Sequence, residues 1–312
     1  MPLDPQAREH LNRAASLKMP RYDQVSPSEA RRMFFERRAL AGEPEEVESV
    51  EERMLEEGFA VRIYRPKAKP TDRQDSLRAG LVYFHGGGWL LGNLDTIDVP
   101  CRALANASGR VLISVDYRLA PEHKYPSALE DCFAATKWTM THAEDLGIDP
   151  KRIGVGGDSA GGTLAIGVCL LARDREAGRL PHPLDFQLLI YPVLDPACDT
   201  QSYRDFAEGF GLTAETMRYF WKQYLSSADQ ALDPLAAPLR SEFIDLPRAF
   251  VATAEFDVLR DEGEAYVDAL LFAGVPVDHL RFDGLIHGFL TLAGVIDRAK
   301  AATKEIGERL AN

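Results

Sequence analysis

The chain has 312 residues, of which 46% are hydrophobic and 27% are charged, a globular composition that excludes wholesale disorder. Its 48 acidic and 36 basic residues give a formal net charge of −12, which disfavours binding to nucleic acid or to an anionic membrane surface. The first residues carry mixed charge, no long apolar stretch follows, and the four cysteines lie far apart without a C-x-x-C pair. These features predict a cytoplasmic protein with reduced cysteines, no membrane span and no metal site.

Residues 1–45 are predicted to be helical. The tetrapeptide SPSE at 26–29 is a capping box with proline at the first helical position. Apolar residues then follow on one helical face, namely Ala30, Met33 and Phe34. Residues 44–57 are acidic and weakly patterned, so no element is assigned to them, and a strand is predicted from Phe59 onward.

Short apolar runs bounded by Gly, Pro and Asp recur along the rest of the chain. They are Leu81–Phe84, Val111–Val115, Arg152–Val155, Phe186–Tyr191, Ala249–Ala254 and Val277–Phe282. Such runs are typical of strands that are buried on both faces of a mostly parallel sheet. Helical segments alternate with them, beginning near Ser127, Ala160 and Arg260. The alternation predicts an α/β fold with right-handed crossovers and helices on both sides of the sheet.

The alternation breaks between Tyr191 and Ala249, where no clear strand is visible. This stretch contains an amphipathic helical pattern made by Met217, Phe220, Trp221, Tyr224 and Leu225. A helical piece inserted between two strands is expected to form a cap, packed against the N-terminal helices. The predicted organisation is an N-terminal cap segment (1–45), the first part of the α/β core (46–195), a cap insertion (196–240) and the second part of the core (241–312).

The pentapeptide GDSAG at 157–161 matches G-x-S-x-G and lies between a predicted strand and a predicted helix. Its glycines permit a sharp strand-to-helix turn, which exposes the Ser159 hydroxyl beside the N–H groups of the helix start. The alternative is a tight turn in which the serine only caps the helix. Nucleotide binding is disfavoured, because a dinucleotide fingerprint would need a glycine at Ser159 and a P-loop would need a lysine at Thr163.

The segment HGGGW at 85–89 directly follows the strand Leu81–Phe84. Successive glycines let backbone N–H groups approach a ligand without interference from a Cβ atom. Together with the N–H of Ala160 they predict an oxyanion hole, and we expect His85 to support the scaffold. The alternative for the glycines is a flexible turn.

A nucleophilic serine needs a base, and the base needs an orienting acid. His287 is the candidate base, because among the seven histidines it alone lies in a loop after a late strand. Asp257 is the candidate acid, because it follows the strand Ala249–Ala254; the alternatives are Glu255, Asp261 and Asp283. The order serine, acid, histidine, each at the carboxyl end of a strand, is that of the α/β-hydrolase fold.

The chain resembles the bacterial hormone-sensitive-lipase-like carboxylesterases from about residue 80 to 290. The motifs that carry the resemblance are HGGG at 85–88, DYRLAPE at 116–122, YPSALED at 125–131, GDSAGG at 157–162, LRDE at 259–262 and HGF at 287–289. One departure is Val258, where the family often has proline. The resemblance implies an α/β-hydrolase fold with a helical cap. It also implies that Ser159 is the nucleophile, Asp257 the acid and His287 the base, with Gly87, Gly88 and Ala160 donating to the oxyanion and Gly86 setting the turn.

The expected activity is hydrolysis of a small-molecule ester by two-step acyl transfer, with no metal or organic cofactor. A cap over the site favours short- to medium-chain acyl groups. Candidate pocket residues are Trp89, Tyr191, Phe34, Phe35, Phe210 and Leu285, although aromatic residues at such spacing also occur as plain core. The alternatives are a deacetylase or amide hydrolase with the same triad, a noncatalytic ligand-binding protein of this fold, and a structural protein. Edge-strand homodimers occur in the family, and the sequence leaves the oligomeric state open.

Overall fold

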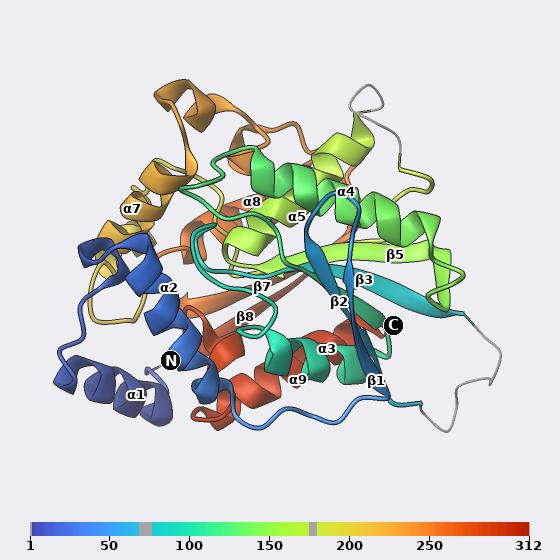
Figure 1. Ribbon diagram of the computed structural model, residues 1–312. Coiled ribbons are helices and arrows are strands. Elements are labelled where there is room, and N and C mark those ends of the chain that lie inside the picture. The colour runs from blue at the N-terminus through green and yellow to red at the C-terminus, as the bar shows by residue number, and fades with distance from the viewer. Residues whose placement is uncertain (1, 69–76, 175–179, 312) are drawn as a thin grey trace.

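The computed structural model describes residues 2–68, 77–174 and 180–311. Within them the strands form one eight-stranded sheet in the order β1-β2-β4-β3-β5-β6-β7-β8, in which β2 pairs antiparallel with β1 and β4 and all other pairs are parallel (Figure 1). The strands are β1 Ser49–Met54, β2 Ala60–Arg65, β3 Arg78–Phe84, β4 Val111–Val115, β5 Ile148–Asp158, β6 Gln187–Ile190, β7 Ala249–Phe256 and β8 Val277–Ile286. The predicted α/β fold with a mostly parallel sheet is confirmed.

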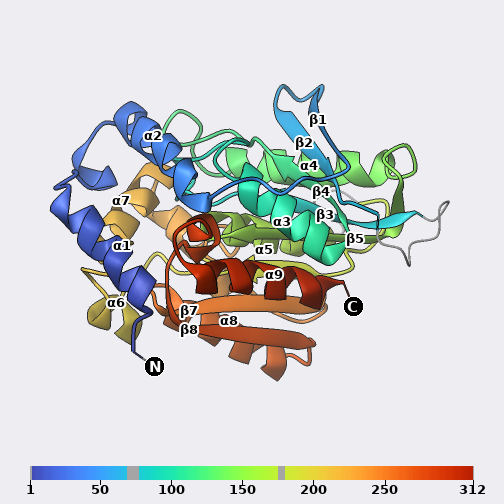
Figure 2. The same cartoon turned by 90° about the horizontal axis from the view of Figure 1, so that it is seen from below.

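Helices cover both faces of the sheet. Helices α3 (Asp98–Ser108) and α9 (Asp297–Leu310) lie side by side on one face, and α4 (Ser127–Thr141), α5 (Ala160–Arg173) and α8 (Arg260–Phe272) cover the other (Figure 2). Each face therefore has its own hydrophobic core.

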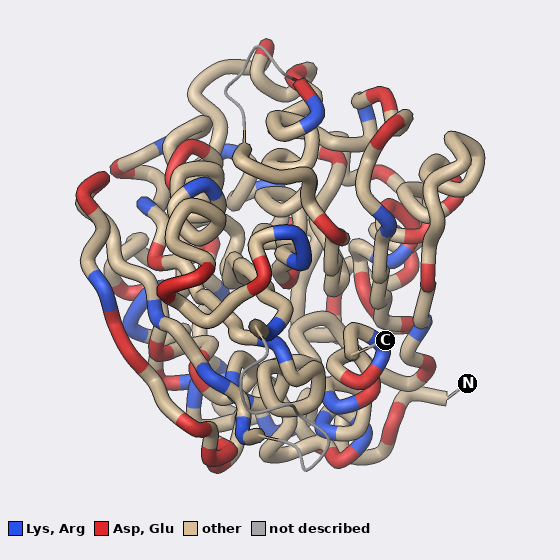
Figure 3. Tube along the Cα trace, turned by 90° about the vertical axis from the view of Figure 1, so that its right-hand side faces the viewer, with Lys and Arg blue, Asp and Glu red and all other residues tan. Residues whose placement is uncertain are grey.

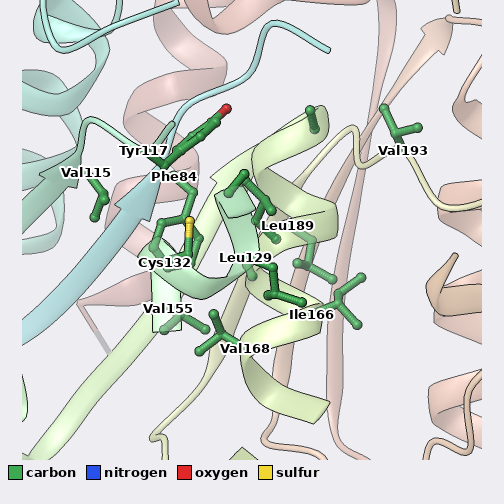
Figure 4. Close-up of a cluster of buried hydrophobic side chains, with 14 of the residues drawn as sticks. Phe84, Val115, Tyr117, Leu129, Cys132, Val155, Ile166, Val168, Leu189 and Val193 are labelled. Carbon is green, nitrogen blue, oxygen red and sulfur yellow. The ribbon is translucent and has the colours of Figure 1, made fainter. Parts of the chain in front are cut away.

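The run Leu81–Phe84 in strand β3 is apolar without alternation because both faces of the strand are buried. Leu81 and Tyr83 belong to the core beneath α3 and α9, whereas Val82 and Phe84 belong to the core beneath α4 and α5. Figure 4 shows part of the second core, including Phe84. Because successive side chains of a strand point to opposite faces, a strand covered on both sides needs apolar residues at every position.

The helix starts follow local capping. Helix α2 (Pro27–Glu36) begins after Ser26, whose hydroxyl accepts a hydrogen bond from the Glu29 N–H at 3.3 Å. Helix α7 (Ala214–Tyr224) begins after Thr213, whose hydroxyl accepts from the Thr216 N–H at 3.1 Å. Both helices lie in segments that the sequence predicted to be helical.

The N-terminal helices α1 (Pro5–Ser16) and α2 gather with α6 (Gln201–Asp205) and α7 at one end of the molecule (Figures 1 and 2). Tyr22, which lies between α1 and α2 in the sequence, connects α2 with α7. Its ring centroid lies 6.1 Å from that of Phe34 in α2 and 6.3 Å from that of Phe220 in α7. The Thr216 hydroxyl also donates to Asp23 at 2.7 Å. The inserted helix and the N-terminal segment are thus in direct contact.

Strand β1 was not predicted from the sequence. It lies at the edge of the sheet within the acidic segment 44–57, and all but one of its residues are exposed. An edge strand without a buried face has no alternating pattern to recognise, and its charges at Glu51, Glu52 and Arg53 discourage pairing with another chain.

All four cysteines are buried and free, and none of the helices in the described residues is long and apolar enough to cross a membrane. In the view of Figure 3, acidic and basic residues are interspersed along the chain and form no face of a single sign.

Candidate active site

Ser159 forms the turn between β5 and α5 in a strained backbone conformation, with φ 54° and ψ −119°. Conformations of this kind cost about 1–3 kcal/mol in a non-glycine residue and persist only where neighbours hold them. Here the Ser159 N–H donates to the Ile190 carbonyl at 2.8 Å, and the Ser159 carbonyl accepts from Gly162 at 2.9 Å. A Cβ atom at Gly161 would overlap the carbonyl oxygen of Phe84, so the turn also needs glycine there.

His287 lies between an acid and the serine. Its Nδ1 is 2.7 Å from Asp257 Oδ2, and its Nε2 is 3.1 Å from Ser159 Oγ. Because a carboxylate only accepts, Nδ1–H donates to Asp257, which leaves the Nε2 lone pair facing the serine hydroxyl. The Asp257 side chain is fully buried and that of His287 is 12% exposed. The three residues that the sequence singled out therefore meet, each at the end of a different strand.

The other oxygen of Asp257 is also occupied, since Oδ1 accepts from the Leu259 N–H at 3.0 Å. Both carboxylate oxygens are thus fixed, and so is the imidazole that Asp257 holds. The alternative acids bond elsewhere: Glu255 to the Gly284 N–H, Asp261 to the Ser202 N–H, and Asp283 to Arg281.

The glycine loop after β3 runs beside the serine turn with φ of +121° at Gly87 and +60° at Gly88. Within the described residues neither amide N–H has an acceptor, so both are available to a ligand. Helix α5 begins at Ala160, whose N–H belongs to the first turn and has no intrahelical acceptor. A Cβ atom at Gly88 would overlap the ring of Phe220, so α7 packs directly on this loop.

His85 has a scaffold position, as expected. Its ring stacks on Tyr117 with centroids 4.3 Å apart, and Nδ1 donates to the Gly86 carbonyl at 2.8 Å. Burial lowers the pKa of His85 to about 4, so the imidazole is neutral at neutral pH. His279 lies within β8, where it hydrogen-bonds the Thr253 hydroxyl at 3.0 Å and not a triad residue.

The candidate pocket residues fall into two groups. Trp89, Tyr191 and Leu285 are at most 1% exposed and pack against other side chains. The Trp89 ring stacks on Tyr224 at 4.2 Å, and the Tyr191 ring lies 4.6 Å from that of His287. The others are partly exposed: Phe34 contacts Tyr22, Phe35 lies against Arg38, and Phe210 stacks on Phe256 at 5.5 Å.

Two buried acids lie beside the site: the sequence pattern assigned no role to Asp158 and favoured Glu262 as a first-turn charge of the following helix. Asp158, the residue before the serine, is buried, and Glu262 in the first turn of α8 accepts from the Leu194 N–H at 2.8 Å. Burial raises the pKa of Glu262 well above its usual value, which favours its neutral form. Periodicity indicates a first-turn charge at this position but not its burial.

Within the described residues, no group of three or more His, Cys, Asp or Glu side chains could hold a metal ion.

Known proteins are similar to this chain over most of its length. A family model described as alpha/beta hydrolase fold matches residues 81–291. The carboxylic ester hydrolase LipN of Mycobacterium tuberculosis is 46% identical over 232 residues, which are 72% of this chain and 61% of that protein. The ethyl acetate hydrolase of Pseudomonas putida is 37% identical over 92% of this chain and 90% of its own length.

Solved structures agree along the whole length. An ester-hydrolase from the metagenome of Lake Arreo, solved with a bipyridine phosphonate derivative, has a TM-score of 0.92 and 36% identity, covering 99% of this chain and 98% of that one. A hyperthermophilic esterase from the archaeon Pyrobaculum calidifontis has a TM-score of 0.90 and 38% identity, covering 100% and 98%. The chain therefore belongs to the alpha/beta-hydrolase family, as its resemblance to the hormone-sensitive-lipase-like carboxylesterases led us to expect.

Proposed function

We propose that this protein, a carboxylic ester hydrolase by family, cleaves short- to medium-chain acyl esters with Ser159 as nucleophile, His287 as base and Asp257 as orienting acid. The observation that carries the proposal is the line of hydrogen bonds from Asp257 through His287 to Ser159. The N–H groups of Gly87 and Gly88, which have no acceptor in the part of the chain that the structure describes, add donors for an oxyanion.

In the first half of the reaction, His287 Nε2 takes the hydroxyl proton as Ser159 Oγ attacks the ester carbonyl carbon. The carbonyl oxygen becomes an oxyanion that accepts from the N–H groups of Gly87, Gly88 and Ala160. The ester C–O bond then breaks, and His287 gives its proton to the leaving alcohol.

In the second half, a water molecule attacks the acyl-enzyme and passes its proton to His287 Nε2. Collapse of the second tetrahedral intermediate breaks the bond to Ser159 Oγ, which regains the proton. The carboxylic acid leaves, and the enzyme returns to its starting state. Asp257 accepts from Nδ1 throughout and so stabilises the imidazolium that forms.

The preference for shorter acyl groups rests on a cap that we assign to α1, α2 and α7. Phe220 of α7 covers Gly88, the Tyr22 ring stacks on Phe220, and Phe34 of α2 contacts Tyr22 in turn. The candidate lining residues that are partly exposed are Phe34, Phe35 and Phe210, whereas Trp89, Tyr191 and Leu285 are buried. The relative from Pseudomonas putida is an ethyl acetate hydrolase by name, which is consistent with short acyl chains.

The test compares the wild type with Ser159→Ala on p-nitrophenyl esters of increasing acyl length. We expect the variant to lose roughly 10⁶-fold in kcat with unchanged circular dichroism, because removing a triad nucleophile alone has an effect of that size. Ser114→Ala, a buried serine in β4, is the matched control and should retain full activity. Substantial turnover by Ser159→Ala would refute the nucleophile. A wild-type kcat/KM higher for dodecanoyl than for butanoyl esters would refute the acyl preference, and faster turnover of matched amides would favour an amide hydrolase.

A further inference from the structure

Asp158, the residue before the nucleophile, is a buried acidic side chain that the reaction above does not use. It is the last residue of β5 and is 6% exposed. Its Oδ1 accepts two hydrogen bonds, from the Tyr83 hydroxyl at 2.9 Å and from the Gly86 N–H at 3.0 Å. One side chain thus links the serine turn, strand β3 and the start of the glycine loop.

Gly86 is fitted closely to this carboxyl group. A Cβ atom at Gly86 would overlap Asp158 Oδ2 and would lie 2.9 Å from the Asp158 carbonyl oxygen. The loop can therefore approach the serine turn this closely only with glycine at 86 and an acceptor at 158. Gly87 and Gly88, the proposed oxyanion donors, are the next two residues, so their distance from Ser159 depends on this contact.

We propose that Asp158 is a positioning residue of the oxyanion hole: its carboxylate, fixed by the Tyr83 hydroxyl, holds the Gly86 amide so that the Gly87 and Gly88 N–H groups face the position of the oxyanion. The inference rests on the proposed function and adds to it. Asp158 acts through the loop and does not touch the substrate.

The charge state of Asp158 fits this role. Burial raises its pKa to about 6, opposed by the hydrogen bonds from Tyr83 and Gly86 and by the proximity of His287, so the carboxylate predominates at pH 7 and above. The other titratable groups around it are Tyr83, Tyr117, Tyr191 and Cys101. Burial raises the pKa of each of these four groups, so they are neutral at neutral pH and place no further charge beside Asp158.

The experiment compares Asp158→Ala, Asp158→Asn and Tyr83→Phe with Tyr266→Phe. Tyr266 is the matched control, because it is also a fully buried tyrosine whose hydroxyl donates a hydrogen bond, 3.0 Å to Gln187 at the amino end of β6, whereas the site lies at the carboxyl ends of the strands. We expect Asp158→Ala to lower kcat about 100-fold and Tyr83→Phe about 10-fold with KM changed little, since one oxyanion donor is worth roughly 10²–10³ in kcat. Tyr266→Phe should keep kcat within twofold.

Two further readouts separate positioning from a purely structural role. The acylation and deacylation rate constants should fall together in Asp158→Ala, because both halves of the reaction form an oxyanion, so the burst amplitude with an activated ester should match that of the wild type. In Asp158→Asn, which keeps an acceptor but loses the charge, the acid limb of the kcat/KM profile should move to lower pH, because a negative charge near His287 is gone.

Equal kcat in Asp158→Ala and Tyr266→Phe, or an acid limb in Asp158→Asn that matches the wild type, would overturn the inference. Loss of the burst in Asp158→Ala with native circular dichroism would overturn it as well. These outcomes differ from failure of the proposed function, which would appear as activity in Ser159→Ala.

Discussion

Position 88 has two requirements that only glycine meets: a positive φ, and close contact with the ring of Phe220 where a Cβ atom would lie. Its φ is +60°, and a Cβ atom there would overlap the Phe220 ring. We predict that Gly88→Ala lowers kcat by at least 100-fold, because both the donor N–H and α7 must move. Steady-state kinetics and urea unfolding of the same variant measure the two effects.

The control is Gly274→Ala. Gly274 also has a positive φ, +78°, but nothing lies within 4 Å of its Cβ position. It should lose about 1–2 kcal/mol of stability from the backbone strain alone, with unchanged kcat. If the two alanine variants behaved alike, backbone strain would account for both and the contact with Phe220 would carry no weight.

For single residues, the sequence predicted that Ser159, Asp257 and His287 belong to the site, but it did not predict Asp158. Their meeting could be predicted because each of the three residues follows an apolar run, and the carboxyl ends of parallel strands lie at one edge of the sheet. Asp158 occupies the variable position of G-x-S-x-G, and its partners Tyr83 and Gly86 come from another strand and the loop after it. Only the three-dimensional pairing of β3 with β5 brings them together.

Between elements, the contact of α7 with the glycine loop is aromatic. Trp89, the residue after Gly88, stacks on Tyr224 with centroids 4.2 Å apart and 6° between planes, and contacts Trp221 at 4.5 Å. We predict that Tyr224→Ala destabilises the protein by about 3–5 kcal/mol, the usual range for a buried aromatic, and lowers kcat because Trp89 loses its support. Urea unfolding followed by tryptophan fluorescence, with kinetics on the same samples, measures both.

Tyr224→Phe is the matched control, because the buried Tyr224 hydroxyl has no hydrogen-bond partner among the described residues. Removing it keeps the ring stack and should leave stability equal or slightly higher. A large loss of activity in Tyr224→Phe would contradict the assignment of the contact to ring packing.

The hydrophobic pattern located several elements with a buried face, but it did not locate the helices α3 and α9, which also have one, and it missed strand β1, which has none. The run Val111–Val115 matches β4 at both ends, because all five residues are buried. The amphipathic pattern at 217–225 located α7, but it could not indicate that Tyr224 would meet Trp89, which is remote in the sequence. Strand β1 was missed because its residues face solvent and are mostly charged.

Over the whole molecule, the pH dependence of stability is a sum of opposing contributions. Carboxylates held by cations, such as Glu122 with Arg31, have a lowered pKa and stabilise the fold at neutral pH. Asp158 acts in the opposite direction, because burial raises its pKa from 3.8 to about 6. Asp158 binds a proton more tightly in the folded protein than in the unfolded chain. Its contribution to the free energy of unfolding is therefore most favourable below about pH 4 and is lost as the pH rises through 6.

Comparison of the wild type with Asp158→Asn follows this group, since the acids remote from Asp158 titrate alike in both proteins. The free energy of unfolding of Asp158→Asn minus that of the wild type should rise between pH 4.5 and 6, by at most about 1.4 kcal/mol per pH unit, and then level off. Any pH-independent loss of hydrogen-bond quality in the variant shifts the whole curve without changing this slope. Urea unfolding at half-unit intervals from pH 4.5 to 8 measures the difference. Parallel stability curves over that range would mean that Asp158 keeps an ordinary carboxyl titration in the folded state, in conflict with its burial between Tyr83 and Gly86.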